Sequence, residues 1–103
     1  MENELIKKIV DSCKKQIDIH KTSDDDDSGI GGWGTFLTTL DFKGINDGVI
    51  LEYTKEKDLE ISIIDPIDLN ISRNLDITHI RREVAKGINL EIKHIKVDLK
   101  KIG

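Results

Sequence analysis

The chain has few of the residue types from which reactive sites are built. It contains one cysteine, one proline and four aromatic residues, of which one is a tryptophan. The single cysteine, Cys13, excludes an intrachain disulfide, and its place in an apolar stripe predicts a buried thiol rather than a nucleophile. Long uncharged runs are also missing, so the sequence predicts neither a membrane span nor a signal-peptide core. We therefore expect a cytoplasmic protein without catalytic cysteine chemistry.

What is present indicates one folded domain with an uneven charge. The chain has 103 residues, of which 37% are hydrophobic and 35% are charged, with a net charge of −4. Residues 1–80 contain 17 Asp and Glu against 9 Lys and Arg, whereas residues 81–103 contain 3 against 7. Such asymmetry indicates either a surface that attracts a partner of opposite charge or two solvated faces that mix in the fold.

Two segments have the spacing of amphipathic helices. Leu5, Ile9 and Cys13 recur at helical intervals, which predicts a helix over residues 3–17 with one apolar face. Ile77, Ile80 and Val84 recur in the same way and predict a second helix over residues 76–86. We expect Asn74 or Asp76 to cap its start and Gly87 to close its end in a left-handed conformation.

Four or five segments alternate like strands. Residues 35–42, 49–54 and 59–64 are separated by turns at 43–48 and 55–58, which are too short for parallel crossovers and predict an antiparallel meander. Pro66 ends the third strand near Asp65, because proline cannot donate to a ladder. Residues 67–72 fit a short edge strand or an extended loop, and residues 88–99 predict a final strand with a bulge near Lys93 and His94. The expected fold is α+β: an antiparallel sheet of about four or five strands with an N-terminal helix and a second helix before the last strand.

The segment from Asp24 to Gly34 breaks this regular pattern. Four consecutive aspartates run into four glycines that surround Trp33, a composition typical of a loop. A calcium loop would need alternating oxygen ligands and a distal glutamate, and a phosphate loop would need a preceding strand and a Gly-Lys-Ser/Thr ending. The segment has neither pattern, so we expect no metal and no cofactor there.

The remaining candidates for chemistry are scattered. His20, His79 and His94 have no partner at the spacing of helical metal ligands, and no serine or cysteine has an evident base. The acidic chain with few aromatics argues against a nucleic-acid platform, although the basic residues after 80 leave that alternative open. Paired carboxylates for acid–base work would have to come from Asp65, Asp68 or the aspartate run.

An acidic loop that carries a tryptophan has the properties of a protein-binding surface. Carboxylates accelerate association with a basic partner, and a tryptophan is a frequent hot spot in interfaces. We expect no catalytic residues and predict partner contacts at the following positions: Asp24, Asp25, Asp26, Asp27 and Trp33, with Asp65 and Asp68 as extensions. Trp33 has an alternative role, in which it folds back beside Phe36 and caps the core.

The order of features resembles that of small bacterial immunity proteins, particularly those that neutralise a tRNA-cleaving colicin. The similar pieces are the helix with Cys13, the Gly31-Gly32-Trp33 segment, and Ile77-x-x-Ile80-Arg81-x-Glu83-Val84-x-x-Gly87-Ile88 before a strand. The chain departs from that pattern in being longer in the middle, around residues 43–48. The resemblance implies a non-enzymatic antidote that binds a basic toxin nuclease and occludes its active site.

Two other classes of function stay open at this point. One is a small enzyme or ligand-binding protein with a pocket between the sheet and the helices. The other is an oligomeric structural subunit that pairs through an exposed edge strand. A deep pocket with convergent polar groups favours the first, and a long free strand edge favours the second.

Overall fold

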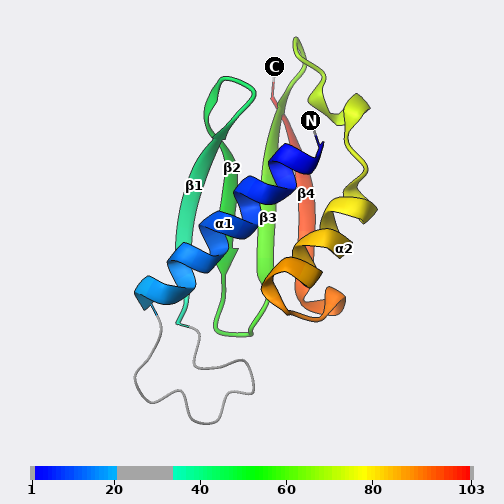
Figure 1. Ribbon diagram of the computed structural model, residues 1–103. Coiled ribbons are helices and arrows are strands. Elements are labelled where there is room, and N and C mark those ends of the chain that lie inside the picture. Colours follow the sequence, from blue (N-terminus) through cyan, green and yellow to red (C-terminus); the bar gives the residue numbers. More distant parts are fainter. Residues whose placement is uncertain (1, 21–33, 103) are drawn as a thin grey trace.

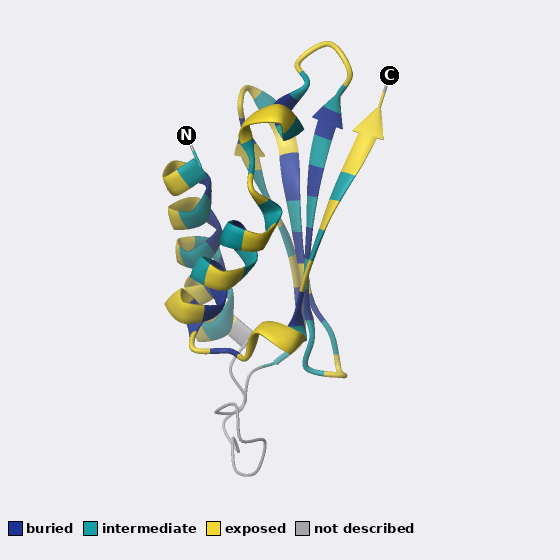
Figure 2. Cartoon of the chain, turned by 90° about the vertical axis from the view of Figure 1, so that its right-hand side faces the viewer, coloured by how far each residue is buried: buried dark blue, intermediate teal, exposed yellow. Residues whose placement is uncertain are grey.

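The protein is a two-layer structure in which both helices cover the same face of one sheet. The computed structural model describes residues 2–20 and 34–102. Along the chain, helix α1 is followed by strands β1 to β3, the 3₁₀ turn η1, helix α2, the 3₁₀ turn η2 and strand β4. Figure 2 views the layers edge-on, with both helices on one side of the sheet and no described element on the other. This arrangement confirms the prediction of an α+β fold.

Helix α1 spans Glu2–His20 and is longer than the predicted helix over residues 3–17. Its apolar stripe packs on the sheet as the spacing predicts, because Leu5, Ile9 and Cys13 are fully buried. Burial raises the pKa of the Cys13 thiol to about 12, so the thiolate that a nucleophile requires is not formed near neutral pH. The prediction of a buried thiol at Cys13 is confirmed.

Strands β1 (Phe36–Phe42), β2 (Ile45–Tyr53) and β3 (Leu59–Pro66) form the predicted antiparallel meander. The first turn is tighter than the predicted turn over residues 43–48. Lys43 and Gly44 both have positive φ, which is the two-residue hairpin geometry, and β2 already begins at Ile45. The extra residues form an irregularity of the ladder between Leu40 and Phe42.

Strand β4 (Ile95–Ile102) pairs with β3 in parallel, so the sheet is mixed and not wholly antiparallel. The strand order is β1-β2-β3-β4, with β1 and β4 at the two edges. The chain between β3 and β4 includes helix α2, and a helical crossover is long enough to return the chain for a parallel pairing. Residues 67–72 were predicted as a short edge strand or an extended loop. Residues 67–69 form a turn, and residues 71 and 72 belong to η1 (Ile71–Asn74).

Helix α2 spans Ile77–Ile88 and runs past the position where the sequence predicts its end. Asp76 caps its start, since its Oδ1 accepts from the backbone N–H of His79 at 3.1 Å. The left-handed residue at the C-terminus is Asn89 and not Gly87. Gly87 has a packing role instead, because a Cβ there would lie 2.7 Å from Cγ2 of Val10 on α1.

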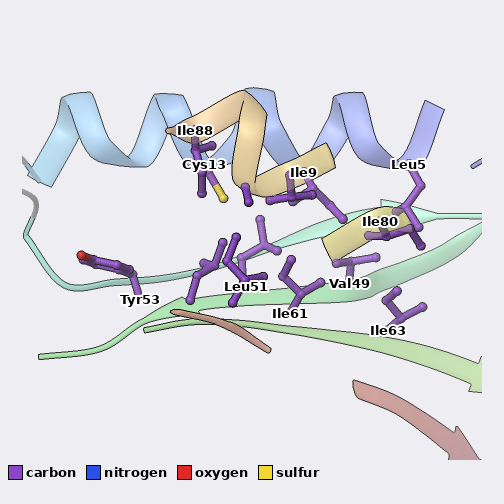
Figure 3. Close-up of a cluster of buried hydrophobic side chains, with 14 of the residues drawn as sticks. Leu5, Ile9, Cys13, Val49, Leu51, Tyr53, Ile61, Ile63, Ile80 and Ile88 are labelled. Carbon is purple, nitrogen blue, oxygen red and sulfur yellow. The ribbon is translucent and has the colours of Figure 1, made fainter. Parts of the chain in front are cut away.

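The predicted strand over residues 88–92 is therefore wrong, as is the bulge near Lys93 and His94. Ile88 is the last residue of α2, and Leu90 is buried in the core after the cap. The 3₁₀ turn η2 (Ile92–His94) then leads directly into β4. Figure 3 shows the resulting core, in which side chains of α1, α2 and the two central strands, β2 and β3, meet between the layers.

Candidate functional site

One face of the sheet is left open by the described helices (Figure 2). Side chains alternate along each strand, so residues that do not enter the core point to this open face. The open face is formed by these residues of the four strands: Leu37, Thr39, Asp41, Ile50, Glu52, Glu60, Ser62, Ile64, Lys96, Asp98 and Lys100. It mixes acidic and apolar side chains on β1 to β3 and carries its lysines on β4.

One cross-strand row of the open face places two glutamates side by side. The register pairs Leu37 with Glu52, Glu52 with Glu60, and Glu60 with Lys96. Like charges directly opposite each other on neighbouring strands are unfavourable for the sheet. Leu37, at one end of the row, has 67% of its surface exposed. The row therefore runs from exposed Leu37 through two adjacent carboxylates to Lys96. Lys96 offsets part of the charge of Glu60, whereas Glu52 has no cation opposite it in the row.

Two further carboxylates lie at the β1–β2 hairpin on the same face. Oδ1 of Asp47 accepts from the Thr39 hydroxyl at 2.6 Å, and Oδ1 of Asp41 accepts from the backbone N–H of Asp47 at 3.0 Å. These hydrogen bonds hold the irregular part of β2, where Asp47 has a positive φ. Both side chains are exposed, so they add negative charge to the open face.

The predicted contacts Asp24, Asp25, Asp26, Asp27 and Trp33 lie outside the described residues. The chain leaves the described part at the end of α1 and returns at Gly34, just before β1. These two points lie at the same end of the molecule (Figure 1). The choice between a partner-binding and a core-capping role for Trp33 stays a prediction.

Asp65 was predicted as an extension of the acidic surface, and the structure places it elsewhere. Its side chain is only 1% exposed, and its carboxylate accepts from the backbone N–H groups of Ile71 at 2.6 Å and Ser72 at 3.3 Å. Nζ of Lys101 lies 4.0 Å away. Hydrogen bonding from Ser72 is the largest cause that lowers the pKa of Asp65, while burial opposes it. A carboxylate used in this way holds the η1 turn against β3 and cannot contact a partner.

Asp68 remains available, because it is exposed in the turn after β3. Its neighbours Ile67 and Leu69 are exposed to 63% and 54%, so the charge sits between two apolar side chains. Asp65 and Asp68 were predicted together as extensions of the acidic surface, and the fold separates them into a structural and a surface carboxylate.

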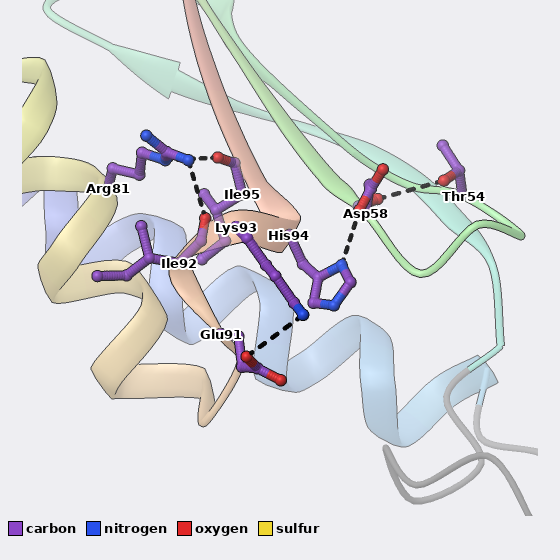
Figure 4. Close-up of polar contacts among 8 residues, drawn as sticks. All are labelled: Thr54, Asp58, Arg81, Glu91, Ile92, Lys93, His94 and Ile95. Atoms are coloured by element: carbon purple, nitrogen blue, oxygen red, sulfur yellow. Dashed lines mark hydrogen bonds and ion pairs between the residues drawn. The ribbon is translucent and has the colours of Figure 1, made fainter.

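His79 and His94 each contact one carboxylate and do not converge on a common site. Nδ1 of His94 lies 3.0 Å from Oδ1 of Asp58, which links the start of β4 to the β2–β3 turn (Figure 4). Nε2 of His79 lies 3.7 Å from Oε2 of Glu2, at the contact between the two helix N-termini. Within residues 2–20 and 34–102, no group of three or more His, Cys, Asp or Glu is placed to hold a metal ion.

An aromatic pair lies at the end of β1 and β2. The rings of Phe36 and Tyr53 stack with centroids 5.7 Å apart. Burial, and secondly the charge of Asp58, raise the pKa of the Tyr53 hydroxyl to about 12. Both rings are buried, so this pair belongs to the hydrophobic core.

The Glu52–Glu60 pair was not predicted from the sequence, although the sequence does indicate that Glu52 faces away from the core. The alternation of Val49, Leu51 and Tyr53 already places residue 52 on the opposite, outer face. What alternation leaves undetermined is the register between β2 and β3, and only that register makes Glu52 the neighbour of Glu60.

Three comparisons with known proteins gave no match. No protein-family model matches the chain, and neither a curated protein nor a solved structure gives a significant match. Of the two described α-helices, neither has the length and apolar character needed to cross a membrane.

Proposed function

We propose that this protein is a non-enzymatic inhibitor of the toxin-immunity kind, which acts by binding a basic protein, a toxin nuclease, and covering its active site. The observation that carries the proposal is the Glu52–Glu60 pair on the uncovered sheet face. An unfavourable pair of like charges is explained if both carboxylates meet Lys or Arg side chains of a partner. Exposed Leu37 beside the pair supplies an apolar contact of the kind that interfaces bury.

The surrounding surface supports the same class of partner. Asp41 and Asp47 extend the negative charge along the open face, and their side chains are already held by hydrogen bonds. Preorganised carboxylates lose little conformational entropy when they bind, so they contribute to fast and specific association. Asp24, Asp25, Asp26, Asp27 and Trp33 remain proposed contacts of the same partner, and Asp68 remains a proposed extension.

The test compares two double variants that remove the same amount of charge. Glu52→Gln with Glu60→Gln removes the pair, and Glu4→Gln with Asp11→Asn removes two exposed carboxylates from α1 as the control. Each purified protein serves as bait for proteins of its source cells, and the retained nuclease is then produced and assayed with each variant. We expect the control to bind and inhibit like the unaltered protein, and the pair variant to lose at least about tenfold in affinity.

Retention of the same partner by both variants with equal affinity would contradict this function. So would a partner that binds tightly and keeps its full nuclease activity. A further variant, in which residues 24–27 are changed to lysine, is expected to slow association most at low ionic strength, because screening shortens the range of the attraction.

A further inference from the structure

The free edge of the sheet at β4 is a second surface with a different chemistry. Figure 2 looks towards this edge, where β4 lies in front of the other strands and α2 lies to one side of it. β4 pairs with β3 on one side only, so its other side has no strand neighbour among the described residues. A free edge of this kind carries unpaired backbone groups that can receive another strand.

The contacts of Arg81 show which backbone groups face this edge. Nε of Arg81, on α2, donates to the Ile95 carbonyl at 2.7 Å, and its Nη2 donates to the Ile92 carbonyl at 3.1 Å (Figure 4). The Ile95 carbonyl therefore points away from β3. Because the direction alternates along a strand, the backbone N–H and C=O of Val97 and Leu99 point the same way. Conversely, the carbonyl of Ile102 points towards β3, where it accepts from the N–H of Ile67 at 3.0 Å.

A groove runs along the same edge, between α2 and β4. It has a volume of about 330 Å³ and is lined on the helix side by Ile77, Thr78 and Arg81 and on the strand side by residues 95–98. An added strand would direct alternate side chains into this groove, where Ile77 and Val97 offer apolar contacts. Its other side chains would lie on the open face beside β4.

The charged side chains along the β4 edge determine which kind of added strand is favoured. Lys96 and Lys100 project from β4 on the open face, with Asp98 between them, and neither lysine forms an ion pair with a residue that the structure describes. Residues 77–102 contain seven Lys and Arg against three Asp and Glu. Side chains of an added strand that lie next to Lys96 and Lys100 are therefore favoured when they are acidic.

We propose that the α2–β4 edge binds an extended acidic segment of a partner protein by strand addition, with acidic side chains beside Lys96 and Lys100 and apolar side chains in the groove. The main-chain groups of Val97 and Leu99 supply the hydrogen bonds, and Arg81 closes the edge at Ile95. The free backbone groups favour a peptide over a nucleic acid, because phosphate recognition makes no use of a strand edge. This surface adjoins the acidic pair, because Lys96 is the register neighbour of Glu60, but strand addition at the β4 edge does not depend on the inhibitor function.

The test uses a labelled heptapeptide of alternating Glu and Val as the probe for the full chain. Amide resonances of the protein are followed by NMR during the titration. We expect saturable shifts at Val97 and Leu99, together with slower hydrogen exchange of these two amides. Lys96→Glu is expected to weaken binding about tenfold, whereas Lys14→Glu, the same charge change at an exposed position of α1, leaves it unchanged.

Two N-methylated peptides separate strand addition from simple charge attraction. Methylation of the Val nitrogens blocks one backbone edge of the probe, and methylation of the Glu nitrogens blocks the other, with all side chains kept. Strand addition uses one edge, so we expect one of the two peptides to lose binding and the other to keep it. The proposal is overturned if both bind equally, if the heptapeptide gives no saturable shift at millimolar concentration, or if a single-stranded oligonucleotide produces the same shifts with higher affinity.

Discussion

The three antiparallel strands and the α2–β4 unit share one core but carry opposite charge. Residues 36–66 contain seven Asp and Glu against three Lys, whereas residues 77–102 contain three against seven. Helix α1 contains four acidic and four lysine residues between Glu2 and His20. It runs diagonally across one face of the sheet (Figure 1). The uneven charge of the sequence is therefore kept as a spatial division, because the strand order places β1 and β4 at opposite edges.

The two regions differ in shape as well as in charge, and we propose different partners for them. The acidic strands offer a flat face with a like-charge pair, which fits a folded basic surface. The basic unit offers a groove beside an unpaired strand edge, which fits an extended acidic segment. Asp65 and Arg81 are exceptions, because the charged group of each forms hydrogen bonds with backbone groups of the protein itself.

The largest effect is expected from Asp65, the acidic residue that does not reach the surface. Asp65→Ala leaves the backbone N–H of Ile71 without its buried acceptor, so we expect Tm to fall by about 10 °C. Thermal unfolding followed by circular dichroism measures this change. The control Asp68→Ala, at an exposed position of the following turn, is expected to leave Tm unaltered. Equal Tm values for the two variants would contradict the structural role of Asp65.

The same residue predicts an acid dependence of stability. The pKa of Asp65 is lowered in the folded protein from its ordinary value of 3.8. Its contribution is therefore fully present above about pH 5 and is lost as the pH falls below 3.8 and through the folded-state value. Denaturant unfolding between pH 6 and pH 2 tests this, and Asp65→Asn should show a flatter profile than the unaltered protein. A profile that is equally steep for Asp65→Asn assigns the acid dependence to other carboxylates.

Arg81 is the corresponding exception in the basic region. Arg81→Met keeps the aliphatic part of the side chain but removes the donors to the carbonyls of Ile92 and Ile95. We expect the free energy of unfolding to fall by about 1.5 kcal/mol, because charged hydrogen bonds to backbone oxygens are lost. The matched change Arg82→Met, at an exposed position of α2, should cost less than about 0.5 kcal/mol. Urea denaturation distinguishes the two, and an equal loss in both variants contradicts the positioning role of Arg81.

The smallest effect concerns the acidic pair and has the opposite sign. Glu52→Gln with Glu60→Gln relieves a like-charge contact, so we expect the free energy of unfolding to rise by about 0.3 kcal/mol at low salt. The gain should shrink in 1 M salt, where charges are screened. Precise urea unfolding curves measure it against Glu4→Gln with Asp11→Asn. A loss of stability in the pair variant would mean that the two glutamates support the fold and need no partner to explain them.

Much of the sheet could be predicted from the sequence, because alternation assigns each strand residue to a face. Phe36, Phe42, Val49 and Leu51 are buried as the pattern indicates, and Leu37 is exposed. The end of α2 was not predictable in the same way. Ile88 and Leu90 fit a strand by alternation, yet Ile88 closes the helix and Leu90 follows its cap. Local pattern gives equal support to both outcomes, and the packing of α1 against Gly87 decides between them.

The candidate sites depended more on contacts between distant residues. The partners of Asp65 lie in η1, and nothing local to Asp65 shows that a turn will place two N–H groups against it. The free edge of β4 depends on its parallel pairing with β3, which the short connections of the meander did not suggest. The charge asymmetry, by contrast, was visible in the sequence, and the fold preserves it.

One NMR experiment tests the central claim that the two regions bind partners of opposite charge. A short lysine-rich peptide and the Glu–Val heptapeptide are titrated separately into the labelled protein, and the amide shifts are mapped onto the strands. We predict that the basic probe shifts Leu37, Glu52 and Glu60, and that the acidic probe shifts Val97 and Leu99. The account is contradicted if both probes shift the same residues, or if their shifts are spread over α1 as much as over the sheet.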